Sequence, residues 1–403
     1  MIKYFYLLLL FASGTVAAQL LNKTDEKTIA RLKKTVLYLA NDKLEGRRTG
    51  TAGEKLAYQY ISKQFKKAGL LPKAESGGYI QSFEVNDKEK RTGHNVVGFI
   101  DNKATATIVL GAHYDHLGYG EDKNSLYTGE QKMIHNGADD NASGTAALIE
   151  LGKWLKKSTL KNYNFLLIAF SGEELGLFGS KYFTEHAGIP VNSINYMINM
   201  DMVGRLNDSS HNISIGGYGT SPLWGQLIKT ENAYLKIKLD SSGTGPSDHT
   251  SFYRKDIPIL FFFTGTHSDY HKPTDDADKI NFNGMAQIVS YIKNILSVTN
   301  QKEKLAFTKT REISMGRSSF KVTLGLMLDY TFSGPGILVE GVSSGKPAEK
   351  AGILAADIIL QLGEYAIADV ETYMKALNKF DKGQTTNVKI KRGNKELLLP
   401  VVF

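Results

Sequence analysis

The sequence contains no cysteine, and this absence excludes several kinds of chemistry. Without thiols the chain has no disulfides, no thiolate metal ligands, no cysteine nucleophile and no thioether-linked lipid. Any metal ion must therefore be held by histidine and carboxylate side chains. With 9 prolines and 39 glycines among 403 residues, long low-complexity linkers are not expected either.

Long runs of one charge are missing as well. The net charge is +8, yet no block of five or more basic residues occurs, which indicates a solvated basic surface and no nucleic-acid partner. One apolar run stands out, from Tyr4 to Ala12, between Lys3 and the small residues that end at Ala18. It is short for a bilayer span and predicts a signal peptide over residues 1–18. We therefore expect an exported protein, periplasmic or secreted, with no transmembrane segment after cleavage.

The composition, with 42% hydrophobic and 22% charged residues, is that of a folded globular protein, and the length suggests two or three domains. Two helices are expected first, over 24–39 and 51–69. Strands are then expected over 95–100, 107–112, 164–170, 196–202, 213–215 and 257–263, and helices over 144–156, 175–186, 221–232 and 284–296. This alternation predicts an α/β fold, a mostly parallel mixed sheet sandwiched by helices.

The composition of the sequence becomes markedly more polar near residue 300. The segment Asn300-Gln301-Lys302-Glu303-Lys304 opens a polar stretch, which predicts a linker over 301–316. The predicted large domain then covers 19–300, and the remaining residues, 317–403, have the length of one small domain.

Histidine and carboxylate residues, which can bind metal ions or exchange protons, follow the predicted strands of the large domain. In open α/β sheets, ligands bind outside the carboxyl ends of the strands. Five segments each deliver a histidine or a carboxylate there, namely His113, Asp140, the pair Glu173-Glu174, Asp201 and His271. Zinc takes imidazole and carboxylate ligands, and two metal ions are well served by one shared carboxylate. The set fits two ions and leaves one carboxylate free as a general base.

This ordered set resembles the zinc aminopeptidase family that includes secreted bacterial leucyl and broad-specificity aminopeptidases, over roughly residues 25–298. The resemblance implies a zinc-exopeptidase fold and two Zn²⁺ ions per chain. It implies that one zinc is bound by His113, Asp140 and Asp201, and the other by Asp140, Glu174 and His271. It also implies that Glu173 is the general base and that Asp115 orients His113.

The function implied by the resemblance is hydrolysis of peptide substrates at their N-terminal residue, by a zinc-activated water whose proton Glu173 accepts. Met202, Phe252 and Tyr253 lie near the matched segments and are candidates for the pocket that holds the substrate side chain. Four further histidines are expected to be non-ligands: His116, His135, His249 and His267.

Residues 320–403 resemble a PDZ domain of the bacterial protease-associated type. The resemblance rests on the helix around Pro347–Ile353 and on the strand entry after it, where Ala356-Asp357 replaces the usual Gly-Asp. It implies that the backbone amides of Leu324, Gly325, Leu326 and Met327 capture the carboxylate of a peptide or protein C-terminus, with strand addition beside them. A β-rich packing domain without a ligand is the alternative.

Three other functions stay open from the sequence. A glutaminyl cyclase on the same fold shares most of these ligands but holds one zinc, so a metal count and an assay with an N-terminal Gln peptide would separate it. A carboxypeptidase needs a basic group for the substrate carboxylate, and Arg205 is the nearest candidate. A non-catalytic peptide-binding scaffold would have lost ligands, whereas every expected ligand is present.

Overall fold

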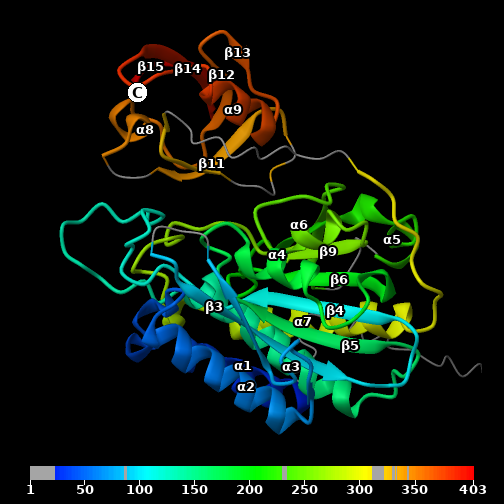
Figure 1. Ribbon diagram of the computed structural model, residues 1–403. Helices are drawn as coiled ribbons and strands as arrows, with labels where there is room; N and C mark the ends of the chain where they lie inside the picture. Colours follow the sequence, from blue (N-terminus) through cyan, green and yellow to red (C-terminus); the bar gives the residue numbers. More distant parts are fainter. Residues whose placement is uncertain are drawn as a thin grey trace, which may run out of the picture.

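The computed structural model describes residues 23–85, 89–228, 234–310, 322–328, 332, 334–342 and 345–403. The predicted signal peptide, residues 1–18, lies outside this set. Figure 1 shows a large domain of helices packed on a sheet, followed by a smaller domain rich in strands. Within the described residues, no helix combines the length and the apolar character needed to cross a membrane.

The large domain is built on one mixed sheet. Its strands are β1 (Leu71–Pro72), β2 (Ile80–Glu84), β3 (Thr92–Ile100), β4 (Thr107–His113), β5 (Asn164–Phe170), β6 (Ile194–Met200), β7 (Asn212–Gly216), β8 (Lys236–Leu239) and β9 (Ile259–Phe263). Among the described residues they lie in the order β1-β3-β5-β4-β6-β9-β7-β8, with β2 beside β3. The central strands β5, β4, β6 and β9 are parallel, whereas β3 and β7 join them antiparallel.

Helices cover both faces of this sheet. They are α1 (Lys23–Leu39), α2 (Ala52–Ala68), α3 (Gly144–Lys157), α4 (Phe178–Glu185), α5 (Trp224–Leu227), α6 (His249–Tyr253) and α7 (Phe282–Thr299). Helices α1, α2, α3 and α7 pack together on one face, and α4 and α6 lie on the other (Figure 1). The predicted α/β fold with a helix-covered mixed sheet is confirmed.

Two of these helices are shorter than the sequence pattern predicts. Helix α4 begins at Phe178 and not at Leu175, because Gly176 and Leu177 both have positive φ, 116° and 64°. In the described part of the helix expected over 221–232, only the four residues of α5 are helical, since Ile228 is extended, with φ −90° and ψ 107°. Residues 229–232 lie outside the described residues.

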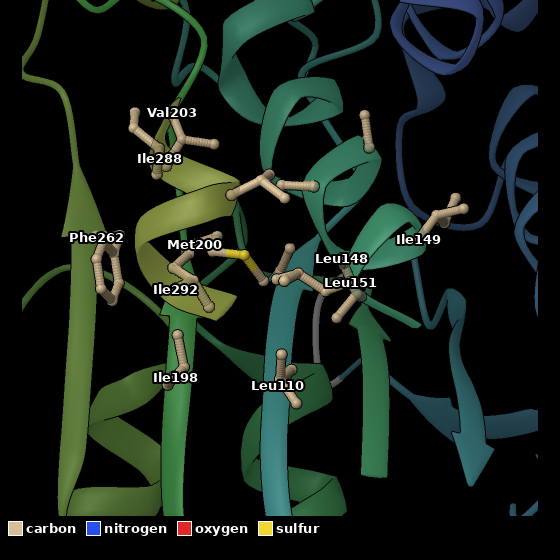
Figure 2. Packing of buried hydrophobic residues seen from close by; sticks show 14 of the residues in the cluster. Leu110, Leu148, Ile149, Leu151, Ile198, Met200, Val203, Phe262, Ile288 and Ile292 are labelled. Carbon is tan, nitrogen blue, oxygen red and sulfur yellow. The ribbon is translucent and has the colours of Figure 1, made fainter. Parts of the chain in front are cut away.

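The core of the large domain is divided by the sheet. On one side, Leu110, Ile198 and Phe262 face the helices α3 and α7, which contribute Leu148 and Ile288 (Figure 2). On the other side a second apolar cluster joins the same strands to α4 and α6, and it includes Val109, Leu166, Ile168, Phe183 and Phe252. Because both faces are covered, the central strands β4, β5 and β6 are buried along their whole length and largely apolar.

The small domain has its own sheet and its own core. Its elements are β10 (Leu326–Leu328), β11 (Ile337–Val342), α8 (Pro347–Lys350), β12 (Ile358–Leu362), β13 (Tyr365–Ala366), α9 (Val370–Leu377), β14 (Thr385–Arg392) and β15 (Lys395–Val402). The strand order within the described residues is β10-β11-β12-β14-β15, with β13 beside β12. A separate apolar cluster that includes Leu324, Val339, Ile359 and Leu377 fills this domain.

The first half of the predicted linker lies against the large domain. Leu305 is buried, and its amide donates to Asn195 Oδ1 at 2.7 Å. The amide of Thr308 donates to the carbonyl of Thr220 at 2.8 Å. Residues 301–310 are therefore part of the large domain's surface, and the second half of the predicted linker, from 311, lies outside the described residues.

Replacing Ala356 with Gly is expected to stabilise the small domain by roughly 0.5–1 kcal/mol. Ala356 is exposed and has φ 69°, a left-handed conformation that a β-carbon disfavours and that Gly adopts freely. Hydrogen exchange of the β12 and β14 amides measures the change. Ala355→Gly is the matched control, because Ala355 is equally exposed but has no positive φ, and it should weaken protection. A loss of protection in Ala356→Gly would contradict this account.

Candidate metal centre

The carboxyl ends of neighbouring strands bring the candidate ligands together. Strand β4 lies between β5 and β6, all three parallel, so the residues that end or follow them meet at one edge of the sheet. A cavity of about 580 Å³ opens there. Its lining includes all the residues predicted to bind metal or act as the base: His113, Asp140, Glu173, Glu174, Asp201 and His271.

The first group of ligand atoms forms around His113. Its Nε2 lies 3.3 Å from Asp140 Oδ1 and 3.2 Å from Asp201 Oδ1. Ligands about 2.0–2.2 Å from a tetrahedral ion are themselves about 3.3–3.6 Å apart. The three side chains therefore have the spacing of ligands that share one ion.

The second group forms around His271. Its Nε2 lies 3.2 Å from Asp140 Oδ2 and 3.3 Å from Glu174 Oε2. Asp140 therefore directs Oδ1 to the first group and Oδ2 to the second. A carboxylate shared in this way is what a pair of neighbouring ions requires. The histidine and carboxylate set also has the chemistry that zinc prefers in a protein without thiols.

Both histidines are held by their other ring nitrogen. His113 Nδ1 faces the carbonyl oxygen of Asp115 at 3.2 Å, and His271 Nδ1 faces that of Asn124 at 2.7 Å. A proton on Nδ1 is fixed by such a carbonyl, so Nε2 presents its lone pair to the cluster of carboxylates. The sequence left open how each ring is oriented, and for His271 the partner is 147 residues away.

Asp115 is placed as expected but acts through two kinds of contact. The carboxylate oxygen Oδ1 of Asp115 is 3.7 Å from His113 Nδ1, whereas the backbone carbonyl oxygen of Asp115 is 3.2 Å from the same nitrogen. The carboxylate accepts hydrogen bonds from Thr49 Oγ1 at 2.9 Å and from the amide of Glu173 at 3.3 Å. Asp115 therefore ties the ring of His113 to the backbone of the predicted general base.

Glu173 stands beside both ligand groups and belongs to neither. It follows β5 after Gly172, whose φ of 67° turns the chain sharply at the cavity edge. Burial raises the pKa of the Glu173 carboxyl well above its usual value, while the charge of His113 opposes this shift and Glu174 adds to it. A carboxyl group with a raised pKa, next to the ligands but outside them, is suited to exchanging a proton.

His116, expected to be a non-ligand, lies in the second group. Its Nδ1 is 2.8 Å from Glu174 Oε1 and 3.8 Å from Asp140 Oδ2. Its Nε2 is buried and has no hydrogen-bond partner among the described residues. His116 therefore fixes the carboxylate of Glu174 and also has the spacing of a ligand that could share an ion with Asp140 and Glu174. The spacing His113-x-Asp115-His116 was the available sequence signal.

The other three histidines lie outside the two ligand groups. His135 Nε2 is 2.7 Å from Ser125 Oγ, and burial lowers the pKa of His135 to about 4. His249 lines the cavity and stacks on Phe261 with ring centroids 4.3 Å apart. His267 Nε2 is 3.3 Å from Asp139 Oδ2.

Two further positioning residues were not anticipated. Asp275 is fully buried and accepts hydrogen bonds from the amides of Asp139 and Asp140, at 3.0–3.1 Å. It fixes the backbone of the shared ligand. Arg47 is also fully buried and donates to the carbonyls of Asn136 and Gly137, just before Asp140. Asp275 could have been anticipated from the sequence, because it ends the segment that contains the predicted ligand His271. No sequence pattern pointed to Arg47.

The three residues predicted to form the side-chain pocket lie in different places. Met202 lines the cavity. Phe252 and Tyr253 do not: they belong to the apolar cluster under α6, where Phe252 packs edge-on against Phe170 with ring centroids 6.0 Å apart. They face the sheet because α6 turns that side inward, and the aromatic part of the lining comes from Phe261 and Phe263 of β9.

The predicted carboxylate-binding loop lies at the start of the small domain's sheet. Leu324 is buried in the small core, Gly325 has φ 76°, and Leu326 begins β10. A glycine with positive φ before an edge strand allows successive amides to turn outward. The backbone of the loop is thus compatible with anion capture.

Comparison with known proteins agrees with these features. Residues 95–296 match the family model described as peptidase family M28, and residues 298–402 match the PDZ domain model. Aminopeptidase YwaD of Bacillus subtilis is 24% identical over 299 residues, 70% of this chain and 60% of that protein. Alignments with three curated relatives, aminopeptidase YwaD among them, span about half to two thirds of the length of those proteins.

Solved structures share the fold at lower identity. BSAP, a zinc aminopeptidase from Bacillus subtilis, superposes with a TM-score of 0.55 at 16% identity, over 69% of this chain and 98% of that one. A glutaminyl cyclase from Porphyromonas gingivalis superposes with a TM-score of 0.57 at 17% identity, over 67% and 98%. The family match covers half of the chain and includes every candidate ligand from His113 to His271, which extends the resemblance seen in the sequence. The chain belongs to peptidase family M28 and carries a PDZ domain after its peptidase domain.

Proposed function

We propose that this protein is an exported, zinc-dependent aminopeptidase that releases N-terminal residues from peptides. The observation that carries the proposal is the shared carboxylate, because Asp140 offers one oxygen to the group of His113 and the other to that of His271. The names of relatives such as aminopeptidase YwaD, and of the zinc aminopeptidase BSAP, support the same activity.

Two zinc ions would be held by the two ligand groups. In this proposal His113, Asp140 and Asp201 hold one ion. Asp140, Glu174 and His271 hold the other. His116, which also has ligand spacing to Asp140 and Glu174, fixes the carboxylate of Glu174. When bound, such ions supply Lewis acidity, which lowers the pKa of a water and polarises a carbonyl group.

Glu173 carries the proton in this proposal. Its carboxylate lines the cavity beside both ligand groups, so it accepts a proton from the attacking water and passes it to the leaving amine. The hydrogen bond from its amide to Asp115 keeps the base in a fixed position relative to His113. Its closeness to the ligands, without being one of them, supports this role.

The rest of the cavity suits the N-terminal end of a peptide. The carboxylates of Glu173 and Asp201 attract a free α-ammonium group, which restricts cleavage to the first residue. Met202, Phe261 and Phe263 supply an apolar wall on the same cavity. We therefore propose a preference for an apolar N-terminal side chain.

The two rival enzymes have less support. A glutaminyl cyclase with one ion would leave the second ligand group without a role, although the fold is shared. A carboxypeptidase would need the guanidinium of Arg205 to be available. Both terminal nitrogens of Arg205 instead face Asp269 Oδ2, at 3.2 and 3.3 Å, and Arg205 is not among the described residues that line the cavity.

An assay on two substrates, combined with a metal count, tests the proposal. Leucine p-nitroanilide should be hydrolysed, and a peptide with N-terminal Gln should release free Gln and no pyroglutamate. Metal analysis of the active protein should give two zinc ions per chain. One ion per chain together with pyroglutamate formation would support the cyclase instead, and no turnover of either substrate would favour a scaffold.

A further inference from the structure

Both domains contribute walls to the catalytic cavity. From the small domain the lining includes Phe332, Gly334, Gly336, Ile337, Ala368 and Asp369. Thr266, another lining residue, donates its hydroxyl to the carbonyl of Leu328 at 2.8 Å. The last residue of β10 thus contacts the rim of the cavity that holds the ligand groups. In Figure 1 the small domain lies next to the side of the large domain on which α6 and β9 are labelled.

Strand β10 is an edge strand. Among the described strands it pairs with β11 alone, at the end of the small domain's sheet. An edge strand offers backbone donors and acceptors to an added peptide. Leu326 of β10 and Met374 of α9 are both partly exposed and pack on the core of the small domain.

The direction of an added peptide follows from the position of the loop. The loop 324–327 lies at the start of β10, and Leu328 at its end contacts the cavity rim. A peptide whose terminal carboxylate rests on that loop, and whose chain lies along β10, must extend from the start of the strand toward its end. Its N-terminal part therefore points to the cavity. The beginning of α9, where Asp369 is the N-cap, also lines that cavity.

We propose that one peptide occupies both domains, with its C-terminal carboxylate on the loop 324–327 and its N-terminal residue in the metal centre. The PDZ domain is then a substrate-holding site of the peptidase, for linear peptides with a free carboxylate. This proposal rests on the proposed aminopeptidase function. Since β10 spans three residues and further residues must cross to the ligand groups, peptides shorter than about five residues reach only one of the two sites.

A length series of peptides that begin with Leu tests the proposal on the full chain. Each peptide, from two to about twelve residues, is compared with its C-terminal amide. Amidation should raise KM about tenfold for long peptides, because it removes the charged acceptor of the loop amides, and should leave kcat unchanged. Dipeptides and tripeptides should show no such difference. Equal KM values for acids and amides at every length, with hydrolysis intact, would overturn the proposal but not the proposed function.

A binding measurement separates the two proposals. Calorimetry with the Glu173→Gln protein should show that a long peptide acid binds about tenfold more tightly than its amide. Leu326→Glu, which sets a negative charge at the loop, should abolish that difference, whereas Leu354→Glu, at an exposed leucine of the same domain, should retain it. Matched thermal unfolding of the two variants checks that Leu326→Glu is folded.

The occupancy of the cavity is the final test. A long peptide acid should inhibit hydrolysis of leucine p-nitroanilide competitively, and an N-acetylated tripeptide acid should not. Binding at the loop without competition for the cavity would show that the PDZ domain serves a separate ligand, and would overturn the proposal. Absence of any hydrolysis by the wild-type chain would instead contradict the proposed function, on which this inference depends.

Discussion

Replacing Glu173 with Gln is expected to lower kcat for leucine p-nitroanilide by about a thousandfold. The amide has nearly the same shape but cannot accept the proton of the attacking water. Because Glu173 belongs to neither ligand group, the zinc ions proposed for the two groups should be retained. Steady-state kinetics and metal analysis of the same preparation check the two halves of this result.

The control for Glu173→Gln is Glu185→Gln. Glu185 ends α4 and is exposed, so its loss should leave kcat and metal content unchanged. Two results would contradict the assigned role. Retained turnover would show that Glu173 is not the base, and loss of zinc together with turnover would show that it serves as a ligand.

The second large effect is on stability: Arg47→Met is expected to lower the free energy of unfolding by roughly 3–5 kcal/mol. The guanidinium is fully buried and donates to four backbone carbonyls, those of Leu39, Tyr114, Asn136 and Gly137, at 2.6–3.0 Å. Methionine fills much of the volume but leaves these acceptors without donors.

The charge of Arg47 adds to this effect. Burial lowers its pKa to about 10, while nearby carboxylates, Asp140 first among them, oppose the shift, so the side chain stays charged at neutral pH. It is a fixed positive charge behind a cluster of carboxylates, and its loss increases their mutual repulsion. Metal affinity is expected to fall in Arg47→Met for a different reason: the segment of Asn136 and Gly137, which leads into Asp140, loses the hydrogen bonds that fix it.

Urea unfolding followed by tryptophan fluorescence measures the change in the large domain. The two tryptophans of the chain, Trp154 and Trp224, both lie in that domain. Arg254→Met, at an exposed position, is the control and should change the free energy of unfolding by less than about 0.5 kcal/mol. An equally small effect of Arg47→Met would refute the structural role given to this residue.

Local patterns were sufficient for the main elements of the fold. The apolar runs predicted β4, β5 and β9 to within two residues, because strands buried on both faces admit few polar residues. The short strands β1 and β8 carry too few residues for a pattern. The helix expected over 221–232 begins only at Trp224 and is interrupted at Ile228, whose extended backbone the helical periodicity did not indicate; residues 229–232 lie outside the described part of the chain.

The export signal, the domain boundaries and the role of each site residue remain predictions. For the metal centre, the positions after strands were informative because the topology of a parallel sheet takes their carboxyl ends to one edge. The family resemblance is confirmed by the match over residues 95–296, and that of the small domain by the match over 298–402.

By itself, the sequence determined the chemistry that is available. The lack of cysteine left histidine and carboxylate as ligands, and the strand ends supplied them in a fixed order. Only the tertiary structure decided that Asp140 directs one carboxylate oxygen to His113 and the other to His271. It also decided that Arg47 and Asp275 hold the backbone around Asp140, and that Phe252 faces the core. It also brought the small domain to the rim of the cavity through Thr266 and Leu328. These contacts join residues far apart in the chain, and their geometry is set by packing, which no local pattern encodes.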